Sequence, residues 1–168
     1  MTEELTTKLS FRVNTAVFDA LSKCAEDNGY EPMAYIQKVL SKHAVESGNM
    51  SPDAETKVRA YDELFELAVE KSRALYKQQG LFDKDWNLTV FRHLMGDAIF
   101  RSKYEKTIGG DAYASGLPGK TPLNMYLCWY IKNAVNAVPE TTPDGKPVRV
   151  QVKNEPIQSY TRLLIGSA

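Results

Sequence analysis

In the stretch Thr7-Lys8-Leu9-Ser10-Phe11-Arg12-Val13, polar and apolar residues alternate from Lys8 onward. Successive side chains of a strand point to opposite faces, so Lys8, Ser10 and Arg12 share one face. The apolar residues between and after them share the other face. Strict alternation over this length predicts a half-buried strand over residues 7–13.

Two helices are expected after this strand. The first should begin at Asn14-Thr15, a favourable cap, and end at Asn28-Gly29, where glycine readily takes the left-handed conformation. The second should begin at Pro32, which fits a first helical turn, and end at Ser47-Gly48-Asn49. Apolar residues recur at the spacings of three and four that mark one helix face. They are Val17, Phe18, Leu21, Cys24 and Ala25, then Met33, Ile36, Val39, Leu40 and Ala44.

One short strand and two helices cannot bury their own apolar faces. A lone strand has two open edges, and a unit of about 40 residues has too small a core. A second copy meets both needs, because the two strands can pair antiparallel about a two-fold axis while the four helices interlock. Such a ribbon would present Lys8, Ser10 and Arg12 outward, once from each copy.

Residues 7–48 therefore resemble the ribbon-helix-helix DNA-binding family, of the Arc and MetJ type. The resemblance covers about a quarter of the chain and implies a dimer that lays a β-ribbon into the major groove of double-stranded DNA. It implies that Lys8, Ser10 and Arg12 read base edges. Lys and Arg can donate to guanine O6 and N7, and Ser can contact several bases.

The sequence departs from the family at Tyr30-Glu31-Pro32-Met33. The family usually has Ser or Thr at the start of the second helix, where backbone N–H groups hold a DNA phosphate. Glu31 would repel that phosphate, and Pro32 removes one donor. Either this phosphate contact is weak, or Tyr30 and other groups replace it.

The rest of the chain predicts a mostly helical domain with one short strand or hairpin, so the fold class is mainly α. We expect domain boundaries at 1–49 and 51–168. The elements expected in the second domain are a helix over 54–79 stopped by Gly80, a helix over 87–106, a loop over 109–121, a helix from Pro122 to about Val135, a strand over 148–152, and a short last element or tail over 160–165.

Charge is uneven along the chain. Residues 1–100 carry 12 Lys and Arg against 16 Asp and Glu, which gives −4, and residues 101–168 carry 9 against 5, which gives +4. The net charge of zero argues against a general polycation and leaves room for a specific binder with local positive charge.

The composition, 43% apolar and 25% charged, is that of a folded globular protein. No apolar run reaches the roughly 20 residues of a membrane span, and the acidic opening segment lacks signal-peptide features, so we expect a cytoplasmic protein. Cys24 and Cys128 are expected as buried free thiols. No metal and no cofactor is expected, since neither His43 nor His93 lies near a cysteine in the sequence.

Two segments invite a catalytic interpretation. Gly116-Leu117-Pro118-Gly119-Lys120-Thr121 resembles part of a phosphate-binding loop but lacks the first glycine, since residue 114 is Ala, and the preceding strand. A loop that carries a lysine is the simpler interpretation. His93 with Asp97 one helical turn later could form an acid/base pair, but no nucleophile motif stands nearby and a surface histidine is commoner. We therefore expect no enzyme.

Basic and aromatic residues are mixed after residue 100, as in surfaces that follow a nucleic-acid backbone. The alternative is that the aromatic residues are core and the basic residues keep the protein soluble, which we favour. The residues concerned are Arg101, Lys103, Lys106, Lys120 and Lys132 with Tyr104, Tyr113, Tyr126 and Tyr130.

The expected function is sequence-specific DNA binding by a dimer, as a transcriptional regulator of a prokaryote, phage or plasmid. Relaxosome or partition accessories and antitoxins use the same module and remain an alternative. A third hypothesis is a dimer that binds a protein partner through the second domain and does not bind DNA. Salt-dependent DNA affinity separates this third hypothesis from the other two.

Overall fold

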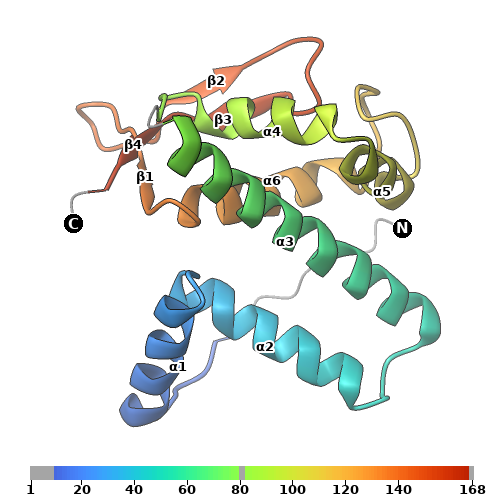
Figure 1. Cartoon of the computed structure of the whole chain (residues 1–168), viewed down its shortest axis with the longest axis vertical. Helices are drawn as coiled ribbons and strands as arrows, with labels where there is room; N and C mark the ends of the chain where they lie inside the picture. Colours follow the sequence, from blue (N-terminus) through green and yellow to red (C-terminus); the bar gives the residue numbers. More distant parts are fainter. Residues whose placement is uncertain (1–9, 80–81, 167–168) are drawn as a thin grey trace. The chain divides into compact units, whose positions relative to one another are not determined.

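A computed structural model describes residues 10–79 and 82–166. In this part the chain has six helices and four short strands, so the predicted mainly α class is confirmed (Figure 1). It forms two compact units, Met1–Arg59 and Ala60–Ala168, and the boundary falls inside helix α3 (Pro52–Gln79). The predicted helix over 54–79 is confirmed as α3, whereas its expected stop, Gly80, lies outside the described residues.

The first unit contains α1 (Thr15–Asp27) and α2 (Pro32–Glu46), which pack against each other. Asn14 caps α1, because its Oδ1 accepts the N–H of Ala16 at 2.9 Å. The turn after α1 places Gly29 at φ +68°, a left-handed conformation that glycine adopts without a steric penalty. Both helices predicted from the sequence are confirmed, with these caps at their ends.

The predicted strand over 7–13 does not form within the described part of this chain. Residues 10–13 have no regular secondary structure, and their side chains are exposed. Residues 7–9, which include Lys8, lie outside the described residues. A strand exists only when a neighbouring strand accepts and donates its backbone hydrogen bonds, and no described segment of the same chain pairs with residues 10–13.

The core of the second unit lies among α3, α4 (Trp86–Gly96), α5 (Ala98–Ile108) and α6 (Lys120–Asn133). Trp86 is fully buried, and its Nε1 donates to Ser72 Oγ at 3.0 Å. Ser72 Oγ in turn donates to the carbonyl of Ile131 at 3.0 Å. These two hydrogen bonds join α4 to α3 and α3 to α6 through groups that would otherwise be buried without partners.

The single helix predicted over 87–106 is wrong, because the chain forms two helices there. At Asp97 the backbone is extended, with φ −87° and ψ 115°, between α4 and α5. Asp97 Oδ1 accepts the N–H groups of Ile99 and Phe100 at 2.9 and 3.1 Å. The preceding Gly96 weakens helix continuation, and an aspartate offers the next helix a cap, so local hydrogen bonding outweighs the apolar periodicity.

The described strands form two antiparallel pairs. β1 (Ala137–Pro139) pairs with β4 (Leu163–Ile165), and β2 (Arg149–Gln151) pairs with β3 (Ser159–Thr161). The predicted strand over 148–152 is confirmed as β2. The last segment, left open as an element or a tail, is ordered as β3 and β4. Strands of three residues are too short for alternation to identify them, which is why the sequence predicted only one strand or hairpin.

Candidate functional site

The expected DNA-binding residues lie at two places in the first unit. Ser10 and Arg12 are exposed in the segment before α1, and Tyr30 is half-buried in the turn between α1 and α2. Lys8 lies outside the described residues. The geometry therefore leaves Ser10 and Arg12 accessible.

Tyr30 forms a contact that sequence reasoning missed. Lys38 Nζ donates to Tyr30 Oη at 3.2 Å and lies 4.9 Å from the centre of the Tyr30 ring. Lys38 is on α2, eight residues after Tyr30, which lies in the turn before that helix. Because Tyr30 is outside the helix, no helical spacing in the sequence pointed to this contact. The pair places a positive charge beside the start of α2.

A side-chain carboxylate of the same chain caps the start of α2. Glu31 is the cap residue, and its Oε2 accepts the N–H of Ala34 at 3.1 Å. Pro32 contributes no N–H. The geometry agrees with the expectation that Glu31 opposes a phosphate at this helix terminus, since the anion would meet a carboxylate already bonded there.

Large apolar side chains of the first unit remain exposed. The residues predicted to line the inner helix faces are mostly uncovered, and of the α1 set only Ala25 is buried. Cys24 is exposed, so the prediction that it is buried is wrong for the single chain. Among residues 10–59, seven large apolar residues are exposed, with these exposed fractions: Phe11 63%, Val13 42%, Val17 51%, Phe18 41%, Met33 55%, Val39 40% and Leu40 49%.

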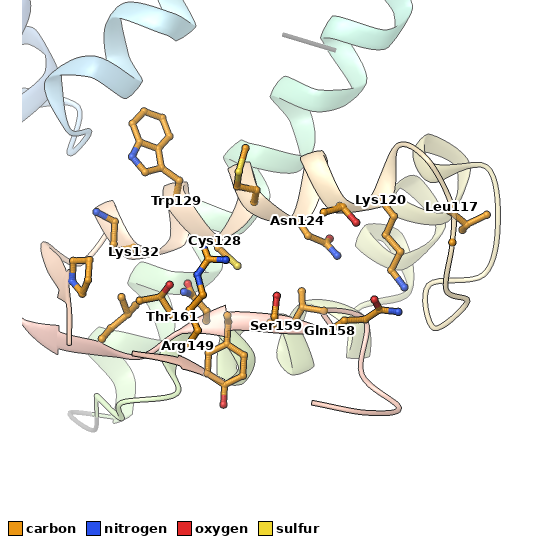
Figure 2. Close-up of a pocket in the computed structure, with 18 residues that line it drawn as sticks. Leu117, Lys120, Asn124, Cys128, Trp129, Lys132, Arg149, Gln158, Ser159 and Thr161 are labelled. Atoms are coloured by element: carbon orange, nitrogen blue, oxygen red, sulfur yellow. The ribbon is translucent and has the colours of Figure 1, made fainter. Parts of the chain in front are cut away.

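The second unit contains a pocket of about 420 Å³ between α6 and the β2–β3 ribbon (Figure 2). Lys120, Asn124, Cys128 and Lys132 line it from α6, and Arg149 lines it from β2. The four α6 residues are spaced four apart, so they share one face of the helix. Sequence reasoning did not identify this face, although the spacing was visible.

The glycine-containing segment before α6 is not a phosphate-binding loop. It follows α5 rather than a strand. Lys120 Nζ donates to the carbonyl of Ala114 at 2.6 Å, and Lys120 is only 4% exposed. The simpler interpretation is confirmed for the loop itself but is wrong for the lysine, because Lys120 begins α6 and is buried at the edge of the pocket. Burial lowers the pKa of the Lys120 ammonium, while nearby Asp111 raises it.

The His93–Asp97 pair is not arranged for acid/base work. His93 is exposed, and the Asp97 carboxylate accepts the two backbone N–H groups that begin α5.

The basic and aromatic residues after residue 100 do not form one surface. Tyr104 and Tyr130 are buried core residues, as the favoured alternative expected. Arg101 pairs with Glu105 at 2.9 Å, and Lys103 pairs with Glu63. Only Lys120 and Lys132 of this set line the pocket.

We predict a loss of stability at alkaline pH that arises from Cys128. Burial raises the pKa of its thiol to about 12, so the folded chain keeps a proton that the unfolded chain releases above about pH 8.5. Below about pH 8.5 the Cys128 thiol therefore does not lower the free energy of unfolding. As the pH rises from there towards 12, the free energy of unfolding falls by up to about 1.4 kcal/mol per pH unit. Urea unfolding from pH 8 to 10.5 should show a smaller decline for Cys128→Ala than for the natural sequence. If the stability of both proteins declines equally with pH, the loss does not come from Cys128.

No family model matches the chain, and neither do any curated proteins or solved structures. In residues 10–79 and 82–166, no helix is both long enough and apolar enough to cross a membrane. Nor does the described part of the chain bring three His, Cys, Asp or Glu side chains together in a possible metal site.

Proposed function

We propose that the protein is a dimeric, sequence-specific DNA-binding protein that acts as a transcriptional regulator. Its first unit would pair with a second copy as a ribbon-helix-helix module and lay the resulting β-ribbon into the major groove. The observation that carries the proposal is the uncovered apolar face of α1, α2 and the segment before them.

A second copy is the occupant that fits this face best. Only Ala25, Ala34 and Val45 of α1 and α2 are buried, which is a small core for two helices. Covering seven half-exposed side chains would contribute roughly 5–10 kcal/mol per copy, before the entropy of association is subtracted. The unpaired segment at residues 10–13 needs a strand neighbour, and its symmetry mate supplies one in the antiparallel direction.

Pairing of the strands would also orient the residues that read DNA. In a strand, Phe11 and Val13 point to the face opposite Ser10 and Arg12. If Phe11 and Val13 are covered by the helices of the dimer, Arg12 and Ser10 face outward from both strands, together with Lys8. A guanidinium or ammonium there can donate to guanine O6 and N7 in the major groove.

The phosphate contact would come from Tyr30 and Lys38 rather than from the start of α2. Glu31 already caps that terminus. The ammonium of Lys38 and the hydroxyl of Tyr30 lie within 3.2 Å of each other, and both groups can donate to a phosphate oxygen. A phosphate contact positions the protein along DNA and carries no sequence information.

The capped start of α2 gives weight to one alternative. If Glu31 prevents phosphate contact, the first unit would only dimerise, and the second unit would bind a protein partner. A relaxosome or partition accessory, or an antitoxin, would keep the same DNA contacts and would be distinguished by co-purification of its nuclease, ATPase or toxin partner.

Fluorescence anisotropy with a pool of random-sequence duplexes, at low and moderate salt, tests the proposal. The natural sequence should bind with a steep salt dependence, because basic side chains release counterions from the phosphates. Selection of the bound duplexes then supplies the operator. On that operator Arg12→Ala should weaken binding by about 1–3 kcal/mol and relax base preference at one position.

Lys23→Ala is the matched control, since Lys23 is an exposed basic residue of α1 away from the strand. It should leave operator affinity within about twofold. Equal losses for Arg12→Ala and Lys23→Ala would mean that only general charge attracts DNA. Absence of binding at low salt would favour the dimeriser that does not bind DNA.

A further inference from the structure

The pocket in the second unit is positively charged. Lys120, Lys132 and Arg149 line it, and none of its described lining residues is acidic. Arg149 is exposed on β2, and no ion pair is found for it in the described part of the chain. Lys120 holds its ammonium between the pocket and the carbonyl of Ala114. An ammonium carries three donors, so that carbonyl uses one of them.

The three cationic side chains lie at different points along the pocket. In Figure 2, Lys120 lies at the end where α6 begins, near Gln158, and Arg149 points towards Cys128 in the middle of α6. Lys132 lies farther along the helix, beyond Trp129. The spacing of the cations along the groove suits a ligand with an acidic group and a body that extends along α6.

Asn87 lines the same pocket and is only 3% exposed. Its Oδ1 has no hydrogen-bond partner among the described residues. A buried amide oxygen without a donor is destabilising, and such atoms in folded proteins usually meet water or a ligand. This oxygen therefore marks where a hydrogen-bond donor of the ligand would be received.

The remaining walls of the pocket are largely apolar. Ile157 and Leu163 are buried beside it, and Leu117, Met125 and Trp129 also line it. Small-molecule sites commonly combine apolar walls with a few placed polar groups, and 420 Å³ is within their usual range.

We propose that this pocket binds a small organic anion, namely a carboxylate or phosphate carried on an apolar or aromatic body with one hydrogen-bond donor. Arg149 and Lys132 would hold the acidic group, and Asn87 Oδ1 would accept from the donor. This goes beyond DNA binding and does not depend on it, because every residue involved belongs to the second unit.

Isothermal titration calorimetry of the full chain with four defined probes tests this. 4-Hydroxybenzoate and phenyl phosphate carry an acid on a ring, inorganic phosphate lacks the ring, and benzyl alcohol lacks the acid. We expect at least one of the ring acids to bind with Kd of about 1 mM, an ordinary value for ligands of this size. Inorganic phosphate and benzyl alcohol, which each lack one of these two groups, should bind at least about tenfold more weakly.

Substitutions assign the binding to the pocket. Arg149→Gln should weaken the better ring acid about tenfold or more, since it removes a charge-assisted hydrogen bond. Lys153→Gln is the matched control, because it removes the same charge from the same β2–β3 ribbon, from a residue outside the lining. It should change Kd by less than about twofold.

Asn87→Leu separates a ligand group from a structural one. It removes the unpartnered oxygen at similar volume, so the unliganded protein should keep or raise its melting temperature while the hydroxybenzoate binds more weakly. A large fall in melting temperature would show that Asn87 supports the fold instead. In that case the comparison of Arg149→Gln with Lys153→Gln would by itself test the proposal.

Three results would overturn the proposal. One is no heat from either ring acid up to about 20 mM, some twentyfold above the expected Kd. Another is an equal loss for Arg149→Gln and Lys153→Gln. The last is tight binding of oligo-deoxythymidine without binding of the small acids, which would make this a nucleic-acid surface.

Discussion

Leu40→Glu should convert the protein from a dimer to a monomer and abolish operator binding. Leu40 is 49% exposed on α2 in the single chain, so the substitution leaves no cavity in the monomer. In the proposed dimer it buries two carboxylates without partners. At about 2 kcal/mol or more for each, the dimer dissociation constant should rise by about 1000-fold or more. Light scattering after size exclusion should report a mass near the 18.9 kDa of one chain.

Lys42→Gln is the control for charge. It makes the same change in net charge two residues farther along α2, on another side of the helix, and breaks only an exposed ion pair with Glu46 at 3.8 Å. Such pairs contribute little, so this variant should remain a dimer. If the protein with the natural sequence is monomeric at micromolar concentration, the proposed dimer is wrong. A Leu40→Glu variant that stays dimeric would place the interface elsewhere.

Trp86→Ala should be the most destabilising substitution in the second unit. The indole is fully buried, donates to Ser72 on α3 and lies edge-on to Tyr76 of the same helix. Removing such a side chain leaves a cavity and typically costs about 3–5 kcal/mol. For a unit of this size the melting temperature should fall by roughly 15–30 °C. Calorimetry of the full chain would measure the shift.

Trp86→Phe separates the ring from its hydrogen bond. Phenylalanine keeps an aromatic ring and loses the N–H together with part of the indole, while Ser72 keeps its bond to the carbonyl of Ile131. Its expected cost is about 1–2 kcal/mol. Equal destabilisation by the two variants would mean that the N–H and the part of the indole that phenylalanine lacks, rather than the retained ring, carry the contribution of Trp86.

The two proposals can fail independently. Arg12 lies in the first unit and Arg149 in the second. Arg12→Ala should weaken operator binding and leave the calorimetric titration with the ring acid unchanged. Arg149→Gln should do the reverse when operator binding is measured without the acid. If operator affinity also changes when the acid is added, the small anion is an effector of DNA binding.

Local signals in the sequence determined most of the helices. Asn14, Gly29 and Pro32 set the ends of α1 and α2, because caps, left-handed turns and first-turn prolines act within one or two turns. An uninterrupted apolar stripe determined α3. The sequence also contained the information for the break at Asp97, but the apolar periodicity on both sides masked it. The paired strand over residues 7–13 remains a prediction that depends on a second chain.

The tertiary structure decided what the local pattern could not. Sequence periodicity reports which face of an element is apolar, and it does not report which distant segment meets that face. The pocket gathers Asn87, Lys120 and Arg149 from three separate elements. The buried position of Lys120 depends on a carbonyl in the loop before its own helix. Such sites arise from long-range packing, in which each contact is set by the positions of all the elements together, so no single stretch of sequence specifies them.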